Sequence, residues 1–122
     1  MEFDVHYVTD NQITDYSDNS IVIKDVKYTT NIILTNNSII DIKHIQNIDQ
    51  ITVESLEPIL SLKPDLVIFG SGKSIRFPHA KVMQALYQNS IGTEVMSVQA
   101  LCRTYNFLVS ENRKIACVIL FD

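Results

Sequence analysis

The chain has 122 residues, with ten Lys and Arg against fourteen Asp and Glu, so its formal net charge at pH 7 is −4. A general nucleic-acid-binding protein needs an excess of basic residues to neutralise phosphates, and this balance argues against that class. With 46% hydrophobic and 20% charged residues, the composition is that of a folded globular protein. The length suits a single domain over residues 1–122.

The charge and the glycines are unevenly spread along the chain. Residues 1–61 carry three Lys against ten acids, or −7, whereas residues 62–122 carry seven basic side chains against four acids, or +3. All three glycines, Gly70, Gly72 and Gly92, lie in the second half. The overall acidity therefore does not exclude a local site for a small anion in that half.

The expected compartment is the cytoplasm. The sequence has no run of roughly 18 apolar residues that would span a bilayer, and its first ten residues lack the basic end and apolar run of a secretory signal. Cys102 and Cys117 are too few for a disulfide framework, and we expect them to be buried thiols. They form a redox pair only if their Cα atoms lie within about 7 Å.

The first part of the chain, residues 1–51, is predicted to be an antiparallel meander. Segments 20–26, 27–35 and 38–43 are rich in β-branched residues, and the first alternates between two faces. Asp18-Asn19 is a predicted turn. Asn36-Asn37 is predicted to form a two-residue hairpin turn with positive φ angles.

From residue 52 to residue 122, helices and strands are predicted to alternate. Residues 52–62 indicate a short helix capped by Thr52 or Ser55, with Pro58 near its start and Pro64 ending it. The apolar run 65–70 predicts a strand buried on both faces.

The rest of this part continues the alternation. A helix is expected over 78–89 with Pro78 in its first turn, and a short strand over 92–97. Ser97 then caps a helix over 98–110, whose apolar stripe is Val98, Leu101, Cys102, Tyr105, Leu108 and Val109. After a turn at Glu111-Asn112, residues 114–121 predict a final buried strand. This pattern is typical of a layered α/β core to which the first hairpins are added.

The Gly-Ser-Gly turn at residues 70–72 is the first candidate site. A Walker A loop would need a glycine where Val67 stands, and a dinucleotide fingerprint would need one at Ile75. What remains is a glycine turn at the carboxyl end of a central strand, the usual place for ligands on open α/β sheets. The glycines either only turn the chain tightly or leave backbone N–H groups that attract a small anion.

Polar residues elsewhere extend this candidate site into a groove. One face of the predicted helix is polar and carries Gln99, Arg103, Asn106 and Ser110. This face is either an ordinary solvated surface or one wall of a groove whose other wall is the Gly-Ser-Gly turn. Glu94, at a strand end, is expected to pair with a basic residue. The candidate ligand or partner groove comprises Gly70, Ser71, Gly72, Lys73, Arg76, Glu94, Arg103, Asn106 and Arg113.

No catalytic residue, metal site or cofactor is expected. His6, His44 and His79 lack metal-ligand spacing, and none stands beside a candidate nucleophile. Ser71 lacks the outer glycines of a nucleophile elbow.

The second half resembles a family of domains of unknown function that includes mitochondrial complex I assembly factor 3 and an adipogenesis-associated domain protein. The matching motifs are a strand ending in G-x-G, a proline, a strand with E-x-M, a helix with A-x-x-x-T-Y-N-x-L, and E-x-R. In this chain they are Gly70 and Gly72, Pro78, Glu94 and Met96, Ala100 with Thr104-Tyr105-Asn106 and Leu108, and Glu111 with Arg113. Val98 departs from the family's more usual threonine.

The resemblance implies a three-layer α/β fold: a mixed central sheet with helices and an additional N-terminal antiparallel β-layer. It implies no reaction. We therefore expect a small non-enzymatic, assembly-factor-like module that binds a protein partner or a second copy. The alternative is a small anionic ligand or substrate at the Gly-Ser-Gly turn. In a third interpretation the family motifs are structural, with Tyr105 in the core and Arg113 bracing the last turn with Glu111.

Overall fold

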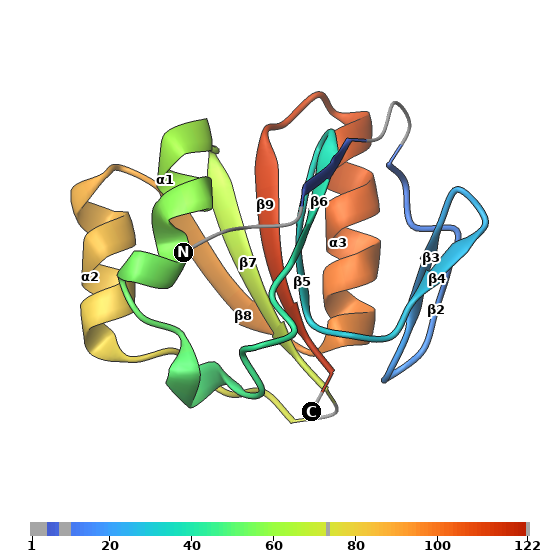
Figure 1. The fold of residues 1–122 in the computed structure, drawn as a ribbon. Helices are drawn as coiled ribbons and strands as arrows, with labels where there is room; N and C mark the ends of the chain where they lie inside the picture. Colours follow the sequence, from blue (N-terminus) through green and yellow to red (C-terminus); the bar gives the residue numbers. More distant parts are fainter. Residues whose placement is uncertain (1–4, 8–10, 73, 122) are drawn as a thin grey trace.

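The computed structural model describes residues 5–7, 11–72 and 74–121. Its centre is a six-stranded mixed sheet (Figure 1). The strands, in the order in which they lie side by side, are β1 (Val5–Tyr7), β6 (Ser38–Asp41), β5 (Ile32–Thr35), β9 (Ile115–Leu120), β7 (Leu66–Ser71) and β8 (Gly92–Met96). β7, β8 and β9 are parallel, whereas β5 is antiparallel to both β9 and β6.

A second, three-stranded antiparallel sheet is formed by β2 (Asp15–Tyr16), β3 (Ile21–Ile23) and β4 (Val26–Tyr28). The helices are α1 (Glu57–Leu62), α2 (Ala80–Gln88) and α3 (Val98–Ser110), with the short 3₁₀ helices η1 (Ile48–Gln50) and η2 (Glu54–Leu56).

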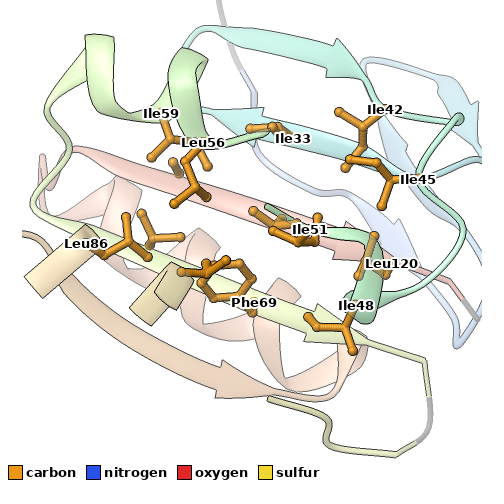
Figure 2. Packing of buried hydrophobic residues seen from close by; sticks show 14 of the residues in the cluster. Ile33, Ile42, Ile45, Ile48, Ile51, Leu56, Ile59, Phe69, Leu86 and Leu120 are labelled. Atoms are coloured by element: carbon orange, nitrogen blue, oxygen red, sulfur yellow. The ribbon is translucent and has the colours of Figure 1, made fainter. Parts of the chain in front are cut away.

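Two apolar clusters on opposite faces of the central sheet hold three layers together. On one face, side chains of α1, α2 and the 3₁₀ helices pack on the sheet; Figure 2 shows Leu86 and Leu56 on the side of β7 that carries Phe69. On the other face, α3 and the three-stranded sheet share a cluster with β5 and β9 that includes Ile21 and Leu101. The three-layer α/β fold and its additional antiparallel sheet are confirmed.

The strongest periodic signals in the second half are confirmed. β9 is buried along its whole length, because it lies between two other strands and under both covering layers. Ser97 caps α3, its Oγ accepting a hydrogen bond from the Ala100 N–H at 3.3 Å. The helix predicted over 52–62 is shorter than expected: α1 begins at Glu57, and its N-cap residue is Leu56, which makes no side-chain cap bond. Thr52 and Ser55, the predicted caps, instead bond to each other's backbone N–H groups ahead of α1, at 3.1 and 3.3 Å.

Four further local predictions were wrong, the last of them in part. Residues 20–26 form a hairpin, because Lys24 and Asp25 take φ angles of 49° and 64° and turn the chain between β3 and β4. The predicted strand 27–35 is divided into β4 and β5. Pro78 precedes the first turn of α2, because His79 is the N-cap residue. The turn at Asn36-Asn37 does join β5 to β6, but neither residue has a positive φ.

Candidate functional site

Gly70 allows α3 to lie close against β7. In the sheet it pairs with Met96 of β8 and Ile119 of β9. A Cβ atom at this position would lie 2.7 Å from Leu101 Cδ1 and 3.4 Å from Leu101 Cβ. None of the three glycines has a positive φ. The glycine is therefore explained by close helix–strand packing.

Ser71 and Gly72 use their polar groups inside the protein. The Ser71 hydroxyl donates to the Ser74 carbonyl at 2.6 Å and accepts from the Arg76 N–H at 3.1 Å. The Gly72 N–H donates to the Leu120 carbonyl at 2.9 Å. Two N–H groups near the turn thus already have protein partners. Lys73 lies outside the described residues, and binding of a small anion at this turn stays a prediction.

The loop that follows, residues 74–79, is named here the anchored loop. Its backbone is held by Ser71, and the Arg76 guanidinium lies 2.9 Å from the carboxylate of Asp49 in η1. Ile75, which lies between Ser74 and Arg76, is 58% exposed, and Phe77, which directly follows Arg76, is 67% exposed, whereas Pro78 is buried. The loop therefore presents two large apolar side chains to solvent from a backbone with internal hydrogen bonds.

Arg113 lies at the other end of the parallel strands. Leu66 pairs with Ile115 and Ser71 with Leu120, so Arg113 is separated from the Gly-Ser-Gly turn by roughly 16 Å of strand. Its Nε lies 3.8 Å from Asp65 Oδ2. The structure therefore does not bring Arg113 into one groove with Gly70 to Gly72.

Asp65 and Asn36 hold the turn that carries Arg113. The Asp65 N–H donates to the Lys114 carbonyl at 2.8 Å, and Asp65 Oδ2 accepts from the Lys114 N–H at 3.1 Å. Asn36 accepts from the Ile115 N–H and donates to the Arg113 carbonyl, both at 2.7 Å. The partner of Arg113 is thus Asp65, not the expected Glu111. Sequence reasoning missed both Asp65 and Asn36.

The polar face of α3 contacts the N-terminal part of the chain. The Asn106 side-chain amide accepts a hydrogen bond from the Ile13 N–H at 2.8 Å and donates one to the Ile13 carbonyl at 2.7 Å. It thus satisfies both backbone groups of Ile13, as a residue of a neighbouring β-strand does. Gln99 donates to the Asp18 carboxylate at 2.8 Å. Arg103 is exposed on the same helix. Asn106 therefore attaches the N-terminal segment to α3.

Glu94 is the central residue of β8, paired with Ile68, and not a strand end as predicted. Its side chain is exposed.

Tyr105 is fully buried in the cluster beneath α3. Its hydroxyl donates to the Thr35 carbonyl at 3.1 Å, and Asn11 Nδ2 donates to the same oxygen. The structural interpretation of this residue is confirmed.

Tyr105→Phe is expected to lower the free energy of unfolding by about 1 kcal/mol, the net value of one hydrogen bond, because Asn11 still satisfies the Thr35 carbonyl. Urea denaturation measures this loss, and partner binding should stay unchanged. A variant with wild-type stability that no longer binds would show that the hydroxyl acts in recognition.

Both cysteines are buried in the cluster between α3 and β9. Burial raises the pKa of the Cys102 thiol from 9.0 to about 12, although the charge of Arg103 acts in the opposite direction. Burial, and next the neighbouring Cys102, raises the pKa of Cys117 well above its usual value. Both thiols are therefore protonated and unreactive at neutral pH.

The stability of the protein should fall as the pH rises above about 9. The unfolded chain then loses thiol protons that the folded chain retains, because burial raises the pKa of Cys102 to about 12 and that of Cys117 well above 9.0. Each buried thiol therefore lowers the unfolding free energy by up to about 1.4 kcal/mol per pH unit. Denaturation at pH 8, 9 and 10 measures this slope. Cys102→Ala/Cys117→Ala is the control, and an equally steep slope in that variant would refute the assignment.

A concavity of about 610 Å³ lies near Arg113, at the end of the sheet where β7 and β9 begin, and Lys63 and Asp65 are among its lining residues. Lys63, which follows α1, has a left-handed backbone with φ 50°. Sequence reasoning did not find this concavity, because its walls come from the ends of α1, α2 and α3.

Within the described ranges, no three His, Cys, Asp or Glu side chains are arranged to hold a metal ion. In the same part of the chain, no helix has the length and apolar character needed to cross a membrane.

Comparisons with solved structures show the fold. A Bordetella parapertussis protein superimposes with a TM-score of 0.81 at 26% identity, covering 92% of this chain and 96% of that one. A Bartonella henselae chain described as an outer membrane protein gives a TM-score of 0.82 at 21% identity, covering 94% and 98%.

Curated relatives match over shorter stretches. The 13 kDa major membrane protein of Francisella tularensis subsp. holarctica (strain LVS) is 29% identical over 76 residues, or 62% of each chain. NADH dehydrogenase (ubiquinone) 1 alpha subcomplex assembly factor 3 of Danio rerio is 35% identical over 72 residues, which cover 57% of this chain and 41% of that protein. The match thus spans less than two thirds of the length of these relatives.

A family model described as "Protein of unknown function (DUF498/DUF598)" matches residues 13–120. This range includes all three helices and every strand of the two sheets except β1. The chain belongs to the DUF498/DUF598 family.

Proposed function

We propose that this chain is a protein-binding module rather than an enzyme, that it acts in the manner of an assembly factor, and that the anchored loop is part of its binding surface. The observation that carries the proposal is the exposure of Ile75 and Phe77 on a loop held by Ser71 and Asp49. Aromatic side chains, phenylalanine among them, are enriched at protein interfaces relative to the rest of the surface.

The anchoring of this loop favours binding of a partner. A loop whose conformation is already held by hydrogen bonds loses little conformational entropy when it docks. The hydroxyl of Ser71, the one hydroxyl in the Gly-Ser-Gly turn, is used for this anchoring. The chemistry of the turn therefore supports a role in shaping a surface.

The relatives support a protein partner. Assembly factor 3 of Danio rerio and of Mus musculus, 35% and 37% identical to this chain over 72 and 65 residues, are named for the assembly of NADH dehydrogenase. By analogy, the partner of this chain would be a protein subunit or another assembly protein. We place the module in the cytoplasm, which cell fractionation tests.

The experiment is chemical cross-linking in the native cells, followed by affinity purification of the tagged chain. The expected result is one protein in a 1:1 ratio that binds again when both proteins are purified, as measured by calorimetry. Recovery of no stoichiometric partner, or of a second copy of the chain alone, would contradict the proposal.

A further inference from the structure

We propose that the free edge of β8 binds an extended segment of the partner as an added strand, and that this segment places a Lys or Arg opposite Glu94. The inference rests on the proposed protein-binding function and names the surface and the chemistry of the partner segment.

The outer side of β8 presents backbone groups that the central sheet does not use. β8 is the last strand of the sheet, next to β7 (Figure 1). The Gly92 N–H donates to the Asp65 carbonyl at 3.1 Å, so the two-residue alternation of a strand directs the backbone groups of Gly92, Glu94 and Met96 toward β7. The N–H and C=O groups of Thr93 and Val95 therefore point outward. No other strand in the described ranges pairs with this side.

The other edge strands in the described part of the chain are less suited to accept a strand. β1 and β4 have three residues and β2 has two, whereas β8 has five. β4 also carries Lys27 at its centre, a charge that commonly discourages strand addition. β8 contains neither lysine nor proline. It is thus the longest edge and the one without these blocking residues.

Glu94 selects the charge of the added strand. Its side chain is exposed at the centre of β8 and, within residues 5–7, 11–72 and 74–121, has no hydrogen-bond or ion-pair partner. In an antiparallel addition, the residue opposite Glu94 belongs to a non-hydrogen-bonded pair, whose Cα atoms are about 4.5 Å apart. Opposite charges stabilise such a cross-strand pair and like charges destabilise it. A Lys or Arg is therefore favoured at that position.

The same charge disfavours a second copy of this chain. Two β8 strands paired antiparallel over their full length would place their Glu94 carboxylates directly opposite each other. A register shifted by two residues avoids this repulsion but overlaps only three of the five residues. The edge thus suits a different chain.

The edge strand is continuous with the surface proposed above. Met96, at the end of β8, pairs with Gly70, and the Val98 N–H that follows donates to the Gly72 carbonyl at 3.4 Å. The anchored loop starts two residues after Gly72 and leaves the sheet at this same corner (Figure 1). One partner segment that follows β8 can therefore approach the corner that carries Ile75 and Phe77.

A phage-displayed library of random octapeptides tests the inference without knowledge of the natural partner. The wild-type protein should enrich octapeptides with a Lys or Arg at one constant position. A synthetic peptide of the enriched sequence should bind Thr93→Pro at least tenfold more weakly than wild type. Proline lacks the backbone N–H, which at Thr93 points outward and takes no part in the hydrogen bonds between β8 and β7. Glu94→Lys should enrich acidic residues at the constant position instead. Glu111→Lys, the same charge change at an exposed residue after α3, is the matched control and should leave the enriched sequence unchanged.

Several results would overturn the inference. They are the enrichment of no common sequence, binding of the enriched peptide to Thr93→Pro with wild-type affinity, and an unchanged preference in Glu94→Lys. A dimer of the wild-type protein that Thr93→Pro abolishes would show that a second copy occupies the edge. If Thr93→Pro fails to fold, the Glu94→Lys selection still decides. A cellular partner that binds Thr93→Pro and Glu94→Lys as tightly as wild type would refute this inference and leave the proposed function standing.

Discussion

Ile75→Ser combined with Phe77→Ser is expected to weaken binding of the cellular partner by about 100-fold, which corresponds to about 2.7 kcal/mol. The two side chains are 58% and 67% exposed, so their removal takes apolar area from the proposed interface and little from the core. The free energy of unfolding should therefore stay within about 0.5 kcal/mol of wild type. Calorimetry with the purified partner and urea denaturation measure the two quantities.

Two other exposed aromatic residues provide matched controls for this variant. Phe107 on α3 is 63% exposed and Tyr87 on α2 is 82% exposed, and neither belongs to the anchored loop. Phe107→Ser and Tyr87→Ser should bind the partner as wild type does. Equal losses in all the variants, or unchanged binding by the loop variant, would remove the anchored loop from the interface.

Gly70→Ala is expected to lower the free energy of unfolding by about 1–3 kcal/mol, the usual cost of an added methyl group in a well-packed core. The new Cβ would lie 2.7 Å from Leu101 Cδ1, and Leu101 is itself fully buried between α3 and β7. Either the leucine side chain or the helix must move. Thermal and urea denaturation measure the loss.

A double-mutant cycle separates this steric cause from a general effect of alanine in the strand. Leu101→Ala alone should cost about 2–5 kcal/mol. In that background Gly70→Ala should cost much less, because the contact that it would violate is gone. Gly92→Ala is the control on the exposed edge strand: its Cβ would lie 3.3 Å from Asp65 O and from Leu66 Cδ1, and we expect a smaller loss. Strict additivity of Gly70→Ala and Leu101→Ala would contradict the explanation.

The elements of the second half were predictable because their signals are local. A helix such as α3 is encoded by its N-cap, Ser97, and by an apolar stripe that repeats within each turn. The buried strand β7 is encoded by six consecutive residues. The hairpin at Lys24-Asp25 was missed because neither residue is a glycine and the apolar alternation continues across the turn.

The candidate site was predicted less well, because its nine residues belong to elements whose order in the sheet the sequence does not state. Gly72 and Arg113 were grouped as parts of one groove, but β7 and β9 are parallel, so the C-terminal end of β7 and the N-terminal end of β9 lie at opposite ends of the strands. Glu94 was expected to pair with a basic residue, and it stands at the centre of an edge strand.

By itself, the sequence determined a layered α/β class and most of the helices and strands, because periodicity and caps act over a few neighbouring residues. The three-layer arrangement came from the family resemblance, which rests on short motifs. Only the tertiary structure decided which polar groups meet. Asn106 binds Ile13 across 93 residues, and Asn36 binds Arg113 across 77. The net charge of −4 carries no information on such pairs, since the position of each charge depends on strand order. That order also leaves β8 at an edge and the anchored loop at its corner, where the proposed partner binds.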